Sequence, residues 1–262
     1  EEEAQADSYA SQLMEQYGDT YKANGIGLNT VQRFERILIK SSDLLELVYG
    51  VDGETPVSDA DLTSHLENNM YELAYYTIPL YNTGTYAFAD DDQTTEMLNL
   101  AQSAIDDVNS YAATLADLSD STNSSMLMGA FSGVVTSALP DIYKVLDSTY
   151  SSDSDAPSLE LIGDSTVTSA FTAEGAADTV RSLSIGQAAA LKYNGYAMMA
   201  VLRLDPLSLN SLDNLRGQVL NDMKGEELSE ALTAYGASLE HNLSSSAMNR
   251  MPASKIVNSS TN

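Results

Sequence analysis

The spacing of apolar residues constrains the fold of this chain most, because they recur every three or four positions along much of it. The pattern is clearest over residues 93–118. There, one stripe contains Met97, Ala101, Ile105, Val108, Ala112 and Leu115. Such spacing places the side chains on one face of an α-helix. The same reasoning predicts helices over residues 4–22, 29–49, 58–79, 126–138, 141–150, 173–183, 185–204, 211–223 and 226–243.

The helical pattern and the short connections together predict an all-α fold. We expect a multi-helix bundle of about seven to nine helices with short loops. An α/β fold is the weaker alternative, because the candidate strands at 36–40 and 75–81 lie inside helical patterns. Residues 159–167 are irregular and leave room for one short extended piece.

A run of Ser, Asp and Pro at residues 151–157 is the best candidate for a linker. It would separate an acidic helical region, residues 1–150, from a helical region rich in small residues, 158–243. A polar C-terminal tail, 244–262, follows. The alternative is one continuous domain.

The charge is strongly acidic and unevenly placed. The net charge is −26. The segment from Ser41 to Tyr143 contains 17 Asp and Glu residues but no Lys or Arg. This charge repels nucleic-acid phosphates, so we expect no nucleic-acid partner. A halophilic or marine setting explains the acidity, since salt screens the repulsion. A specific cationic partner is the alternative. The tail differs, because after Glu240 it carries Arg250 and Lys255 but no acid.

Several features favour a place outside the reducing cytoplasm. The chain has no cysteine, which excludes disulfides and thiolate metal sites. No apolar run is long enough for us to expect a membrane span. Glycosylation sequons begin at Asn123, Asn242 and Asn258, and the first residue is Glu1, which suggests a removed signal peptide or an excised fragment. We therefore expect a secreted, extracellular or cell-surface protein, with the periplasm as an alternative.

No catalytic motif is present. The sequence lacks a Gly-x-Ser-x-Gly elbow and a phosphate-binding loop. His65 and Glu72 could share a helix face, but one histidine with one carboxylate is a poor zinc site. His241 has no feature that suggests a function. We therefore expect no enzyme and no cofactor, apart from a calcium ion at Asp90, Asp91 and Asp92. The other interpretation of these acids is a solvated helix start, because calcium needs six to eight oxygen ligands.

Two groups of residues suggest contacts with another molecule. Tyrosines near Pro79 are typical of interfaces, although buried rings with wet hydroxyls would also explain them. Small residues at four-residue spacing let helices pack closely, either in a core or against another subunit. The candidate interface consists of Tyr75, Tyr76, Tyr81, Tyr86, Gly129, Gly133, Ile256 and Val257. Met198 and Met199 could line a pocket for a hydrophobic ligand.

These observations favour a non-enzymatic structural or assembly protein, such as a subunit of a filament, layer or larger complex in a saline environment. We expect it to associate with itself or with another protein. The alternative is an extracellular or periplasmic helical module that binds or senses a small hydrophobic ligand.

Overall fold

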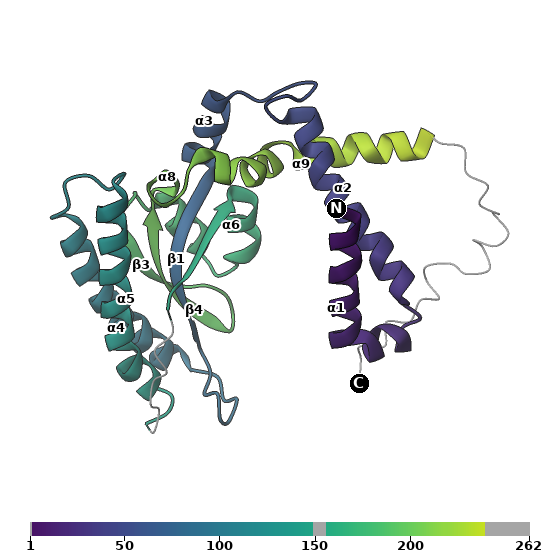
Figure 1. Ribbon diagram of the computed structural model, residues 1–262. Coiled ribbons are helices and arrows are strands. Elements are labelled where there is room, and N and C mark those ends of the chain that lie inside the picture. The colour runs from purple at the N-terminus through teal and green to yellow at the C-terminus, as the bar shows by residue number, and fades with distance from the viewer. Residues whose placement is uncertain (1, 149–155, 239–262) are drawn as a thin grey trace.

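The protein consists of an α/β body, built on a four-stranded antiparallel sheet, and a helical arm that projects from it (Figure 1). The computed structural model describes residues 2–148 and 156–238. It is 63% helical. The prediction of an all-α helical bundle is therefore wrong, and the fold is mixed α/β. The predictions for residues 244–262, including Ile256 and Val257, lie outside the described residues.

The described residues contain thirteen helices and strands. In sequence order they are α1 (Glu2–Ala23), α2 (Leu28–Tyr49), α3 (Asp59–Asn69), β1 (Met70–Pro79), α4 (Asp91–Ala112), α5 (Ser121–Lys144), β2 (Ser158–Gly163), α6 (Asp164–Ala170), α7 (Ala176–Ser182), β3 (Ala188–Lys192), β4 (Ala197–Leu204), α8 (Pro206–Leu209) and α9 (Leu212–Ser238).

The strand order in the sheet is β2-β1-β4-β3, and every neighbouring pair is antiparallel. β1 is a central strand, with Tyr75 opposite Ser158 on one side and Val201 on the other. Strands from before and after residues 151–157 therefore pair in one sheet.

Helices cover both faces of the sheet, and this explains why the residues of β1 resemble a helix in sequence. Ala74 and Ile78 of β1 pack into the core beneath α4 and α5, whereas Leu73 packs into the core on the opposite face. A strand buried on both faces has no alternation of polar and apolar residues. The helix predicted over 58–79 ends at Asn69, and Pro79 stands at the end of the strand.

The helix predicted over 185–204 is also wrong, because this segment forms the hairpin of β3 and β4. The irregular stretch at 159–167 begins with β2 and continues into α6.

One face of the sheet carries α4 and α5. The predicted inward stripe of α4 is confirmed, since Met97, Ala101, Ile105, Val108 and Ala112 are all buried. The side chain of Asn109 on α4 makes two hydrogen bonds to the backbone of strand β3. Its Nδ2 donates to the carbonyl oxygen of Ala188 at 3.0 Å, and its Oδ1 accepts from the amide of Ala188 at 2.8 Å.

Helix α5 is long and apolar enough to cross a membrane. Core helices of soluble proteins can have the same length and composition. Its inner side chains, among them Leu127, Phe131 and Val135, pack into the core that α4 shares.

The other face carries α6 and α7. Val167, Phe171 and Val180 pack there against Leu73 and Val201 of the sheet. Arg181 of α7 joins the two helices by donating from Nε and Nη2 to the two carboxylate oxygens of Asp164, at 2.6 and 3.1 Å.

The arm consists of the antiparallel hairpin of α1 and α2, beside which α9 extends from the body (Figure 1). Arg36 holds the hairpin together through two bonds to the Asp7 carboxylate, at 3.0 and 2.6 Å. A third core, which includes Leu45, Leu66 and Leu220, lies where α2, α3 and α9 meet.

Candidate functional site

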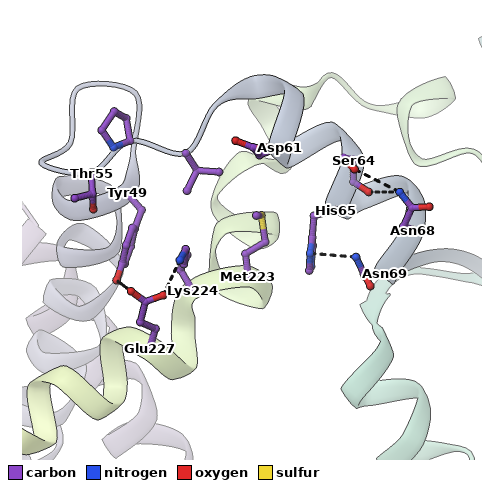
Figure 2. Close-up of a pocket in the computed structure, with 12 residues that line it drawn as sticks. Tyr49, Thr55, Asp61, Ser64, His65, Asn68, Asn69, Met223, Lys224 and Glu227 are labelled. Carbon is purple, nitrogen blue, oxygen red and sulfur yellow. Dashed lines mark hydrogen bonds and ion pairs between the residues drawn. The ribbon is translucent and has the colours of Figure 1, made fainter.

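A pocket of about 720 Å³ lies between the loop that follows α2, helix α3 and helix α9 (Figure 2). Apolar groups of Val57 and Met223 share its wall with polar groups from α3 and α9. Ser58 is the N-cap of α3, and its side chain accepts a hydrogen bond from the Asp61 amide. The pocket is thus formed by elements that the third core holds in place.

His65 is the pocket residue most suited to proton transfer, but both of its ring nitrogens are engaged. Nε2 lies 2.7 Å from Oδ2 of Asp222, and Nδ1 lies 3.3 Å from Nδ2 of Asn69. Because the Asn69 amide can only donate from Nδ2, the Nε2 hydrogen points to Asp222. Gly163 leaves the space that the Asp222 carboxylate occupies, since a Cβ there would collide with Oδ1. His65 therefore ties α3 to α9, and neither nitrogen is left for a metal or a substrate.

Three other polar residues of the pocket, Tyr49, Lys224 and Glu227, bond to one another. Tyr49 donates from its hydroxyl to Oε1 of Glu227 at 3.0 Å, and Lys224 donates to Oε2 at 2.6 Å. The Lys224 ammonium lowers the pKa of the Glu227 carboxyl, with help from Tyr49. Burial and this carboxylate raise the pKa of Tyr49. Such a paired network stabilises the junction of α2 and α9, and it offers neither an activated nucleophile nor a free base.

The predicted calcium site has a structural role at the start of α4. Asp90 is the N-cap: its Oδ1 accepts from the Gln93 amide at 2.8 Å, and the Gln93 side chain accepts from the Asp90 amide at 3.0 Å. Asp91 and Asp92 are exposed in the first turn, where they suit the helix dipole. Across residues 2–148 and 156–238, no three His, Asp or Glu side chains gather as a metal site would require.

Two of the four tyrosines predicted for an interface lie in the central strand β1. Tyr76 is buried, with its ring against Phe131 and its hydroxyl 3.0 Å from Oγ of Ser132 on α5. Tyr75 is half-buried on the opposite face and donates to Glu160 at 3.1 Å. Tyr76 therefore joins the sheet to α5, whereas the bond of Tyr75 joins β1 to β2 within the sheet.

The small-residue and methionine candidates fall in different places. Gly129 and Gly133 lie on the exposed side of α5, where an added Cβ would meet nothing within 4 Å. Met198 and Met199 are buried in the cores on opposite faces of β4. Neither methionine lines the pocket in Figure 2.

Tyr81 and Tyr86 do come together, in the loop between β1 and α4, and two residues that the sequence did not single out join them. Phe88 lies against Tyr81, and Tyr196, from the turn between β3 and β4, lies against Phe88. We call these four residues the aromatic tip. Tyr196 lies far from the other three in sequence, so local patterns could not have revealed it.

A second surface that the sequence did not predict lies on the arm. Phe34, Leu38 and Leu44 of α2 are exposed, and Phe34 is 57% exposed. We call these three residues the apolar stripe. Leu38 also lines a groove of about 590 Å³ between α2 and α9, together with Leu45, Leu228, Leu232 and small residues of α9. An exposed apolar surface that continues into a groove is typical of a binding site for another chain.

Glu72 has a different environment from the one expected. It lies on β1, opposite Leu161 and Leu204, so it does not share a helix face with His65. The residue is only 3% exposed, and its Oε2 has no hydrogen-bond partner among the described residues. Burial raises the pKa of the Glu72 carboxyl to about 7. The sequence predicted a helix over 58–79, and nothing in that pattern indicated that Glu72 is buried.

Comparison of the chain with models of protein families, with characterised proteins and with solved structures finds no match.

Proposed function

We propose that the protein is a non-enzymatic binding and assembly protein, which uses its projecting arm to bind an apolar segment of another polypeptide chain. The exposure of the apolar stripe on α2 is the observation that carries the proposal. A secreted or cell-surface location in a salty medium belongs to the same proposal, and the acidic, cysteine-free composition supports it.

The position of the stripe supports binding rather than internal packing. Phe34, Leu38 and Leu44 are spaced so that one face of α2 presents all three. α1 covers a different side of α2, through contacts such as those of Arg36 with Asp7. A soluble protein leaves few large apolar side chains exposed together unless a partner covers them.

The groove beside the stripe suits a helical segment. Leu38 and Leu45 form one wall, and Leu228 and Leu232 of α9 lie across from them. Gly217 and Gly225 line the groove without a side chain. An amphipathic helix that lays its leucines into such a groove would cover the stripe at the same time.

The pocket in Figure 2 supports a binding role over catalysis, because Tyr49, Lys224 and Glu227 bond to one another, and His65 is engaged with Asp222 and Asn69. The alternative role, binding a small hydrophobic ligand beside Met198 and Met199, gains no support, since both side chains are packed in the core.

Binding to a designed peptide tests the proposal. The probe is a short uncharged peptide of Leu, Ala and Gln with its leucines on one helical face, and a peptide of the same composition in scrambled order is its control. We expect the patterned peptide to bind and Phe34→Gln to weaken its binding roughly ten-fold, which is typical for the loss of one large anchor. Fluorescence anisotropy measures both affinities.

A matched variant shows whether the stripe itself is responsible. Met126→Gln removes a side chain of α5 that is 49% exposed, close to the exposure of Phe34, and should leave the affinity unchanged. Equal binding of the patterned and scrambled peptides, or equal losses in the two variants, would refute the proposal. Sedimentation velocity on the protein alone shows whether the partner is a second copy of the chain or a different protein. If it is a second copy, the protein should self-associate and Phe34→Gln should reduce that association.

A further inference from the structure

We propose that the aromatic tip is a second binding site, which takes an arginine- or lysine-bearing segment of a protein partner. The tip is built from the loop between β1 and α4 and the turn between β3 and β4, whereas the apolar stripe lies on α2 of the arm. The inference therefore stands apart from the proposed function, and either can fail without the other.

The four rings form one continuous cluster. Tyr86 stacks on Tyr81 with 6.2 Å between ring centroids and 19° between ring planes, and Phe88 meets Tyr81 at 5.8 Å. Tyr196 extends the cluster, 5.8 Å from Phe88. Tyr86 is 73% and Tyr196 is 64% exposed. Rings that contact one another yet remain open to solvent offer a ready surface for a partner.

The loop holds the outermost ring in place by an unusual backbone conformation. Tyr86 has a φ of +57°, in the left-handed region that bulky residues rarely adopt. Its amide donates to the carbonyl oxygen of Asn82 at 2.7 Å, and the Asn82 side chain accepts from Gly84 and Thr85. Asn82 also donates to the carbonyl oxygen of Leu146, which anchors the loop to the body. These bonds hold Tyr86 in a strained conformation although its ring belongs to none of the three cores, as expected of a residue with a binding role.

The charge beside the rings selects the chemistry of the partner. Asp90, Asp91 and Asp92 follow Phe88 closely, so they lie at most about 14 Å from it along the chain. Asp91 and Asp92 are exposed, and Lys192 is a cation at the nearby end of β3. The local balance is acidic, as is the whole chain with its net charge of −26. A segment with several basic side chains can stack one of them on an aromatic face and pair another with a carboxylate.

The test uses a labelled peptide of alternating Arg and Ser, titrated into the complete protein and followed by fluorescence anisotropy. A Glu-Ser peptide of equal length and a soluble oligosaccharide serve as competing probes. The test variant is Tyr86→Asn with Tyr196→Ser, in which asparagine tolerates the left-handed backbone. The matched control is Tyr235→Ser, because Tyr235 is also 64% exposed but lies on α9.

We expect the Arg-Ser peptide to bind, the tip variant to weaken binding roughly ten-fold, and Tyr235→Ser to leave it unchanged. Asp91→Asn with Asp92→Asn should weaken it roughly three-fold, and added salt should remove this difference. Three results would overturn the inference: no binding of the Arg-Ser peptide, binding that the tip variant does not alter and that therefore reflects net charge alone, or tighter binding of the oligosaccharide at the same rings.

Discussion

Replacing Glu72 by glutamine should stabilise the protein above neutral pH. The carboxyl lies on the central strand β1 between Leu161 and Leu204, 3% exposed, and one of its oxygens has no hydrogen-bond partner among the described residues. A buried carboxylate without a partner destabilises the folded state, because water solvates it in the unfolded chain. Glutamine keeps the shape of the protonated acid and cannot ionise.

The pKa sets the magnitude and the pH range. Burial raises the pKa of Glu72 from 4.5 to about 7, so the folded protein holds this proton more tightly than the unfolded chain does. The destabilisation is absent below pH 4.5, grows between pH 4.5 and about 7, and is constant above that range. The difference between the two pKa values corresponds to about 3 kcal/mol of unfolding free energy.

Urea unfolding of Glu72→Gln and of the wild type, at several pH values, measures this effect. The variant should be about 3 kcal/mol more stable near pH 8, and the difference should vanish near pH 4.5. Comparing the two proteins at each pH cancels the contributions of other acids, such as Asp164, whose pKa is lowered by its bonds to Arg181. Glu67→Gln is the control, since Glu67 is an exposed glutamate of α3 and should change stability by less than about 0.5 kcal/mol. A difference for Glu72→Gln that is independent of pH would refute the argument.

Two further substitutions test local features of the body by thermal or urea unfolding. Gly186→Ala should destabilise the protein by about 1–3 kcal/mol, because Gly186 has a φ of +82° and an added Cβ would collide with Leu118. Gly129→Ala is its matched control on an open helix face, and should stabilise by about 0.5–1 kcal/mol; equal effects would contradict the structure. Asp90→Ala should cost about 1 kcal/mol through loss of the α4 cap, whereas a loss of stability only in calcium would indicate a metal site.

The sequence predicted the amphipathic helices well and the sheet badly, for one physical reason. α4 has one buried face and one solvated face, so its stripe from Met97 to Ala112 appears directly in the sequence. β1 is buried on both faces, and β3 and β4 include alanines, a residue with high helix propensity. Pairing with distant strands outweighs that local preference.

The binding surfaces were harder to predict than the helices. The sequence predicted the helix that carries Phe34, Leu38 and Leu44, but no local signal tells whether another layer covers these side chains. Tyr81 and Tyr86 were recognised as interface candidates from their type and spacing. Tyr196 joins them only because β4 lies beside β1 in the sheet.

Hydrogen–deuterium exchange with the patterned leucine peptide tests the central claim, that the apolar stripe binds another chain, most directly. We predict slower exchange of amides in α2 and in the part of α9 that lines the groove, with no change in α4 and α5. The scrambled peptide should leave all of these amides unchanged. Protection that appears only in the body, or nowhere while the peptide is bound, would contradict the assignment of the arm as the binding surface.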